Sequence, residues 1–244
     1  MKKFLSINYS DGKLYEISKE EKEDWAKYES KTGKVSYRKY YDKGATGVFQ
    51  GIKLRNWEYG DEIQVFLKDG EDQLVVAFKI YTQKGNVDDT YMIPFIQVLP
   101  NMTVGETYTI FPYNFTPDGE KYAKRGVSVK QNGERVDRKI SMEYTTRDGK
   151  HTPGDIPQLD WKEDKLTGKK KPSAASIEKR DETVKEFLSA LLERLPVEGV
   201  SESGETKPEE VKKEEKPRPA PSKEPETKVE KVVEEKPTKK KLPF

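Results

Sequence analysis

The stretch that decides the fold is GVFQGIKLRNWEYGDEIQVFLKDGEDQLVVAFKIY, residues 47–81. Apolar and polar residues alternate along three segments of it, which is the period of a half-buried strand. Short turns at residues 58–61 and 68–71 separate the segments, and Asp69-Gly70 supplies the positive backbone dihedrals of a tight hairpin. The stretch therefore predicts a meander of three antiparallel strands. Its core-facing residues are expected to be Val48, Ile52, Leu54, Ile63, Val65, Leu67, Leu74, Val76, Phe78 and Ile80.

The opposite parity of the meander carries aromatic rings interleaved with cations and, in the expected register, no acid. Unpaired bases stack on aromatic rings and phosphates bind cations, so this face is predicted to bind single-stranded nucleic acid. The alternative is that the rings pack under the N-terminal segment or at a dimer interface. The candidate binding residues of the meander are Phe49, Lys53, Arg55, Trp57, Phe66, Lys79 and Tyr81.

Composition limits the class of protein. Of the 244 residues, 37% are charged and only 32% are hydrophobic, so part of the chain is expected to lie outside any packed core. A net charge of +2 means that binding of a polyanion must rest on local patches. The absence of cysteine excludes disulfides and thiolate metal sites. Because the sequence has neither a membrane-length apolar run nor a signal-peptide core, we expect a soluble intracellular protein.

The segments that flank the meander add further elements. Residues 1–43 predict a β extension: two strands around Ser10-Asp11-Gly12 and a third at residues 35–41, where Tyr37 and Arg38 are candidate binding residues. A helix is expected within residues 86–101, with Asp88 and Asp89 at its N-cap. Their alternative use as metal ligands lacks a third ligand, so no metal site is predicted. Strands at residues 106–115, 121–131 and 134–138 contribute Phe111, Tyr113, Lys124 and Arg125 to the candidate binding site.

The order of three strands, a helix and two strands is that of the OB-fold, a small Greek-key barrel that binds single-stranded oligonucleotides. The predicted fold is therefore mainly β, with a five-stranded OB-fold-like barrel over residues 44–138. The chain also resembles the single-stranded DNA-binding proteins of bacteriophages. The likeness rests on the meander, FIQVLP at residues 95–100, TIFPYNF at 109–115 followed by Pro117-Asp118-Gly119, and GVSVKQNG at 126–133, and it covers roughly residues 44–195. It implies an OB-fold and a part in DNA replication, recombination or repair.

The C-terminal third is expected to form three parts. Residues 139–172 read as a polar loop, and residues 173–196 as an amphipathic helix with Ser176 as N-cap, whose apolar stripe packs on the barrel or forms an oligomer contact. Residues 197–244, rich in Glu, Lys and Pro, are predicted to be disordered. The terminal Leu242, Pro243 and Phe244 resemble the tip by which bacterial single-stranded DNA-binding proteins recruit replication and repair partners, although lysines precede them here instead of acids.

The sequence thus predicts a non-catalytic protein that binds single-stranded DNA with little sequence specificity and needs no cofactor. If the chain is phage-encoded, it would act in the cytoplasm of the host cell. Two alternatives remain: a phage virion or assembly protein that uses the barrel to oligomerise, and a single-stranded RNA-binding module. The sequence offers no nucleophile–base pair, metal cluster or phosphate-binding glycine loop, so an enzyme is not predicted.

Overall fold

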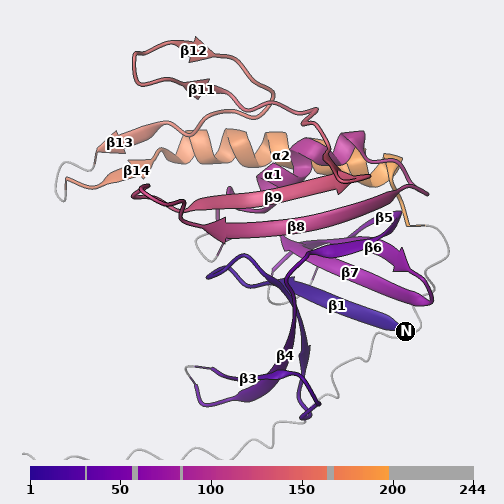
Figure 1. Ribbon diagram of the computed structural model, residues 1–244. Helices are drawn as coiled ribbons and strands as arrows, with labels where there is room; N and C mark the ends of the chain where they lie inside the picture. Colours follow the sequence, from indigo (N-terminus) through magenta and orange to yellow (C-terminus); the bar gives the residue numbers. More distant parts are fainter. Residues whose placement is uncertain (31, 57–59, 83–84, 164–167, 198–244) are drawn as a thin grey trace, which may run out of the picture. The chain divides into compact units, whose positions relative to one another are not determined.

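The computed structural model describes residues 1–30, 32–56, 60–82, 85–163 and 168–197 (Figure 1). Ten strands of this part form one mixed sheet in the order β10-β9-β8-β5-β6-β7-β1-β2-β4-β3. The strands are β1 (Lys2–Ile7), β2 (Leu14–Ser18), β3 (Ala26–Glu29), β4 (Val35–Tyr41), β5 (Ala45–Arg55), β6 (Glu62–Asp69), β7 (Asp72–Lys79), β8 (Thr107–Phe115), β9 (Lys124–Gln131) and β10 (Glu134–Arg135).

Two short hairpins and two helices complete the described elements. The hairpins pair β11 (Tyr144–Thr145) with β12 (His151–Thr152), and β13 (Trp161–Glu163) with β14 (Lys170–Pro172). The helices are α1 (Met92–Val98), which continues into a 3-10 turn at Leu99–Asn101, and α2 (Ala174–Arg194). Both lie on the side of β9 away from β8 in Figure 1. The predicted disordered tail, residues 197–244, falls outside the described residues from residue 198 onward.

The predicted meander is confirmed, but the predicted closed barrel is wrong. β5, β6 and β7 pair as consecutive antiparallel strands. Closure would require β7 to pair with β9, and both edges of each strand are already in use. β7 pairs with β6 on one side and, in parallel, with β1 on the other, while β9 pairs with β8 and β10. The N-terminal strands thus extend the same sheet at the edge where a barrel would have closed.

A β-bulge in β5 changes the predicted parity of the first strand. Phe49 pairs with Leu67 and Gly51 pairs with Phe66, so two steps along β5 oppose one step along β6. A bulge of this kind moves all following side chains to the other face. Before it, Ala45 and Phe49 point into the core; after it, Ile52 does. The prediction that Phe49 belongs to the outer face is therefore wrong.

Helix α1 packs against the core face of the sheet. The rings of Phe95 on α1 and Phe78 on β7 stack with a centroid distance of 4.3 Å and an interplanar angle of 6°. The predicted capping by acids is wrong, because the N-cap is Tyr91 and no side chain caps the helix. Asp88 instead accepts hydrogen bonds from the Tyr9 hydroxyl at 2.8 Å and from the Thr90 backbone amide at 2.9 Å. The hydrogen bond between Tyr9 and Asp88 holds the β1–β2 turn against the segment before α1. Burial and the neighbouring Asp88 carboxylate raise the pKa of Tyr9.

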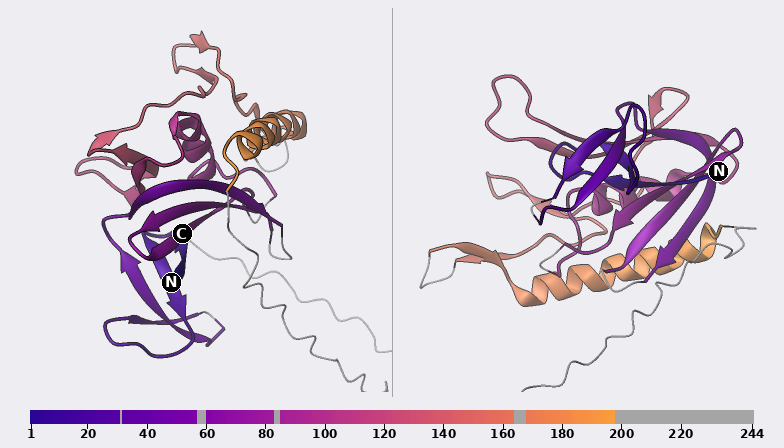
Figure 2. Two further views of the ribbon diagram at one scale, coloured as in Figure 1. Left: turned by 90° about the vertical axis from the view of Figure 1, so that its right-hand side faces the viewer. Right: turned by 90° about the horizontal axis from the view of Figure 1, so that it is seen from below.

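Helix α2 packs on the sheet through the predicted apolar stripe, of which Val184, Leu188, Leu191 and Leu195 are buried in the core. Ser173, and not Ser176 as predicted, is the N-cap, since its side chain accepts a hydrogen bond from the Ser176 amide. The C-terminal end of α2 meets β5, where the Ile52 amide donates to the Leu195 carbonyl at 2.8 Å (Figure 2).

Gly51 makes this close approach sterically feasible, so Gly51→Ala is expected to destabilise the fold by about 2 kcal/mol. A Cβ at this position would lie 2.7 Å from the Pro196 carbonyl oxygen, and the backbone φ of +127° is one that L-residues rarely adopt. Chemical denaturation would measure the loss. Gly70→Ala is the control for the backbone cost alone, because φ is +60° there and open space surrounds the site. Equal losses for both variants would contradict the contact between α2 and β5.

Candidate functional site

Two of the rings of the meander that were predicted to bind nucleic acid are buried. Phe49 is fully buried and Phe66 is 1% exposed, so the prediction that these two rings lie open is wrong. The Lys2 ammonium lies over the Phe66 ring at 5.3 Å. Burial, together with the charges of Lys53 and Arg55, lowers the pKa of Lys2. Three cations therefore gather here, while the Phe66 ring beneath Lys2 is buried and cannot stack on a base.

This face also carries an acid, contrary to the prediction. Glu62 is buried on β6, where it accepts a hydrogen bond from Gln64 at 2.9 Å and lies 3.6 Å from Arg55. Lys53 and Lys79 are exposed. Tyr81 lies beside Lys185 and Asp181 of α2, and burial raises its pKa. Trp57 lies outside the described residues.

The predicted ring and cation pattern is found open on the neighbouring pair β8 and β9. Tyr108, Ile110, Val127 and Val129 point into the core, so the other parity of both strands faces away from it. The register places Phe111 opposite Ser128, Tyr113 opposite Gly126 and Phe115 opposite Lys124, all on that outer face. Next to them, Lys130 of β9 lies directly opposite Arg135 of β10.

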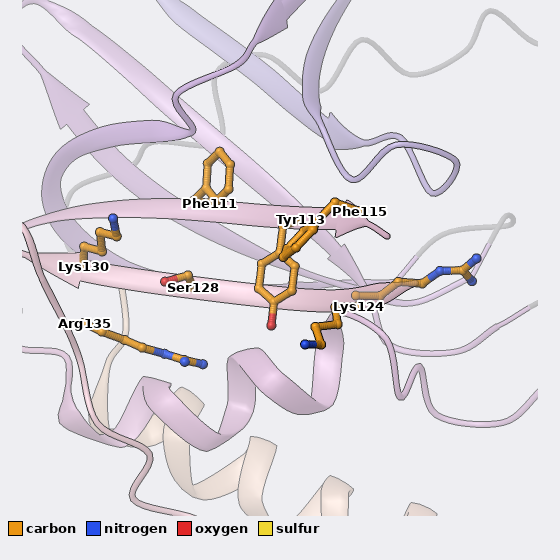
Figure 3. A pocket seen from close by; sticks show the side chains of 8 residues that line it. Phe111, Tyr113, Phe115, Lys124, Ser128, Lys130 and Arg135 are labelled. Atoms are coloured by element: carbon orange, nitrogen blue, oxygen red, sulfur yellow. The ribbon is translucent and has the colours of Figure 1, made fainter. Parts of the chain in front are cut away.

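These side chains surround a shallow hollow of about 530 Å³, shown in Figure 3. Three rings of β8 line it, with Ser128 between the cations of β9 and with Arg135 reaching in from β10 (Figure 3). Phe111 and Tyr113 are half-buried and Phe115 is 53% exposed, so part of each ring is open to a ligand. None of the described residues that line the hollow is acidic: they are Phe111, Tyr113, Phe115, Lys124, Arg125, Ser128, Lys130 and Arg135.

Gly126 sets the orientation of the central ring. A Cβ at this position would lie 2.8 Å from the Tyr113 hydroxyl oxygen and 3.1 Å from its Cζ. The absence of a side chain on Gly126 therefore lets the Tyr113 ring lie flat across β9, as Figure 3 shows. The Phe115 ring follows with a centroid distance of 5.8 Å and a tilt of 51°. The two rings thus form a stepped platform along one side of the hollow.

The cations of the hollow differ in how they are held. Lys124 forms an exposed ion pair with Glu120 at 2.6 Å, which water and salt weaken. Arg125 lies opposite Asn114 in the register, on the other parity from the rings, and donates to it through Nε at 3.2 Å, so it borders the hollow from the edge. Lys130 and Arg135 make no ion pair within the described part of the chain, although they lie directly opposite each other across two strands. Like charges in that position repel, so a bound anion would relieve the repulsion.

The two N-terminal candidates lie apart from the hollow and on opposite faces of β4. The Tyr37 hydroxyl donates to Glu21 at 3.4 Å. The Arg38 guanidinium stacks on Tyr28 at 3.3 Å and on Tyr15 at 4.3 Å. The third predicted group, Leu242, Pro243 and Phe244, lies outside the described residues.

The structure thus brings together four of the predicted site residues: Phe111, Tyr113, Lys124 and Arg125. It adds Phe115, Ser128, Lys130 and Arg135, which were not among the residues predicted from the sequence. Two signals would have found them: alternation along residues 107–115 puts Phe115 on the parity of Phe111, and the Asn132-Gly133 turn sets Lys130 opposite Arg135.

The hollow defines a binding surface of planar rings and positive charge on an open β-sheet. Within the described ranges, neither helix combines the length and apolar character needed to cross a bilayer. The same part of the chain contains no group of three His, Asp or Glu side chains that could hold a metal ion. Comparisons with family models, with characterised proteins and with solved structures find no match to this chain.

Proposed function

We propose that the protein binds single-stranded DNA, with little sequence preference and without catalysis, through the hollow on β8 and β9. The observation that carries this proposal is the meeting of three partly open rings and four cations, with no acid among the residues that line the hollow. Each ring offers a face to a base, and every base has such a face, so stacking tolerates any sequence. The cations neutralise phosphates. Lys130 and Arg135 are expected to contribute most, because a phosphate bound between them relieves the repulsion of two positive charges that face each other.

The resemblance to bacteriophage single-stranded DNA-binding proteins supports the same ligand. Two of its motifs supply the site directly: TIFPYNF is most of β8, and GVSVKQNG runs through β9 into the turn before β10. A part in phage DNA replication, recombination or repair, in the cytoplasm of the host cell, belongs to this proposal. The open ten-stranded sheet departs from the barrel that the resemblance implies, so the site, and not the fold, supports the proposed ligand.

Titration of the full-length chain with fluorescent oligothymidylate tests the proposal. We expect a dissociation constant in the micromolar range or tighter at low salt. Because four cations line the hollow, the logarithm of the affinity should fall with the logarithm of salt concentration with a slope of about −3. Fluorescence anisotropy at several salt concentrations measures both quantities. Absence of binding at low salt, or binding that salt does not affect, would contradict the proposal.

Two further measurements separate the alternatives. Competition between oligouridylate and oligothymidylate distinguishes RNA from DNA as the preferred strand, since the hollow offers stacking and phosphate contacts that both can use. Light scattering of the purified protein without nucleic acid tests the assembly alternative. Large complexes that form without any oligonucleotide, combined with no binding of either strand, would favour a structural protein.

A further inference from the structure

The N-terminal strands β2, β4 and β3 carry a second ring and cation surface, which we call the stacked ladder: Tyr28, Arg38, Tyr15 and Tyr40. The Arg38 guanidinium lies between two rings, 3.3 Å from the centroid of Tyr28 and 4.3 Å from that of Tyr15. The rings of Tyr15 and Tyr40 follow with centroids 6.1 Å apart. Four flat groups from three strands therefore succeed one another across the sheet.

The strand register places the whole ladder on one face. Tyr15 pairs with Tyr40, while Arg38 pairs with Ile17 on one side and Ala26 on the other. On this face, β2, β3 and β4 carry no acid. The acids of these strands, Glu16 and Glu29, lie on the opposite face with Tyr37, because they alternate with the ladder residues. The arrangement separates ring and cation from carboxylate within one small sheet.

The ladder is open at its Tyr28 end, while Tyr15, Arg38 and Tyr40 are half-buried. Tyr28 at its end is 39% exposed and the neighbouring Ile17 is 56% exposed. β3 is exposed at every residue, and Figure 1 shows β3 and β4 well away from α1 and α2. Arg38 Nε is buried and makes no hydrogen bond within the described chain, so the guanidinium is held by stacking between the two rings. β2, β3 and β4 supply no acid to this face that would compensate the positive charge of Arg38.

We infer that the stacked ladder is a second contact for the same unpaired strand, taking bases on Tyr28 and Tyr40 and a phosphate near Arg38. The ligand class rests on the function proposed above, because the ladder repeats the rings and the cation of the hollow. Among the described residues, the acid beside it is Asp42, which pairs at 2.7 Å with the Lys13 ammonium that lies over Tyr40. Guanidinium planes and aromatic rings are the two platforms on which unpaired bases stack. A protein partner would be expected to use the apolar Ile17 and the edge of β3 instead.

The path between the two surfaces is short along the chain. The turn between β1 and β2 leads directly into the ladder strand β2, and it touches β8 at the end of the hollow. Asn114, between Tyr113 and Phe115, donates to the Ser10 carbonyl at 2.9 Å and to the Tyr9 carbonyl at 3.3 Å. The root of the ladder therefore lies beside the Phe115 end of β8. The inference predicts a binding site longer than the hollow alone.

A length series of oligothymidylates, from about 6 to about 40 nucleotides, tests this on the full-length protein. For the variant Tyr28→Leu/Tyr40→Leu we expect long oligonucleotides to bind about tenfold more weakly and the shortest to bind as in the wild type. Tyr37→Leu is the matched control, since this tyrosine lies between the two others in sequence but on the opposite face. Should the double variant misfold, nitration of the wild type by tetranitromethane gives a second readout. Long oligonucleotide should protect Tyr28 and Tyr40 and leave Tyr37 reactive.

The outcomes distinguish this inference from the proposed function. Wild-type affinity of the ladder variant at every length, or no protection of Tyr28 and Tyr40, overturns the ladder as a nucleic-acid contact while the hollow stands. Loss of long-strand binding in the ladder variant, with unchanged binding in variants of the hollow, retains the ladder and overturns the hollow.

Discussion

Replacing Phe111 and Tyr113 together by leucine is expected to weaken oligothymidylate binding by about 30-fold to 1,000-fold. Stacking of one base on one ring contributes about 1–3 kcal/mol, and the double variant removes two platforms. Taking about 2–4 kcal/mol for the pair gives that range. Both residues lie on the outer face of β8 and line the hollow, so leucine at these positions leaves the core unchanged. Anisotropy titration at low salt measures the change.

Tyr122→Leu is the control for this experiment. Tyr122 belongs to the turn that joins β8 to β9, is 73% exposed, and does not line the hollow. Its replacement should leave the affinity within about twofold of the wild type. The urea denaturation midpoints of both variants should match the wild type, which would assign the loss to the binding surface. Equal affinities of the double variant and the control would contradict the hollow as the binding site.

Asp89→Ala is expected to destabilise the protein by about 3 kcal/mol, the low end of the range for breaking a buried ion pair. Arg180 on α2 is 4% exposed, and its terminal nitrogens reach the Asp89 carboxylate at 2.8 and 3.2 Å. Its Nε is buried without a hydrogen-bond partner in the described chain. Removal of Asp89 would leave this guanidinium buried and without its counter-charge. Because Asp89 itself is half exposed, water reaches part of the pair and limits the loss.

A double-mutant cycle separates the coupling energy between Asp89 and Arg180 from the effect of losing either side chain alone. Arg180→Leu together with Asp89→Ala should be more stable than Asp89→Ala alone, since no charge is then left buried. Glu186→Ala, at an exposed position of the same helix, should change the free energy of unfolding by less than about 0.5 kcal/mol. Additive effects of the two substitutions would contradict a coupled pair between α2 and the segment before α1.

The meander could be predicted from the sequence because alternation and turn residues act locally. The predicted assignment of side chains to the two faces is wrong at one point, the bulge in β5. There Phe49 pairs with Leu67 and Gly51 pairs with Phe66. A glycine within a strand pattern, such as Gly51, is a signal of a bulge. The contact that requires a glycine here comes from Pro196, just after the C-terminal end of α2. A contact so distant along the chain leaves no periodic trace in the strand itself.

The predicted barrel failed for a topological reason. Nothing in the alternation of residues 2–7 shows that they pair in parallel with β7, yet that pairing occupies the edge that closure needs. The pattern of rings and cations that the sequence analysis used as its signal pointed first to β5 and β6. There Phe66 and Glu62 are buried instead, and the open version lies on β8 and β9.

Ultraviolet crosslinking of the full-length protein to oligothymidylate, followed by peptide mapping, tests the central claim most directly. The account predicts that adducts concentrate on Phe111, Tyr113 or Phe115 and disappear in the Phe111→Leu/Tyr113→Leu variant. Adducts confined to residues outside β8 and β9 would contradict it.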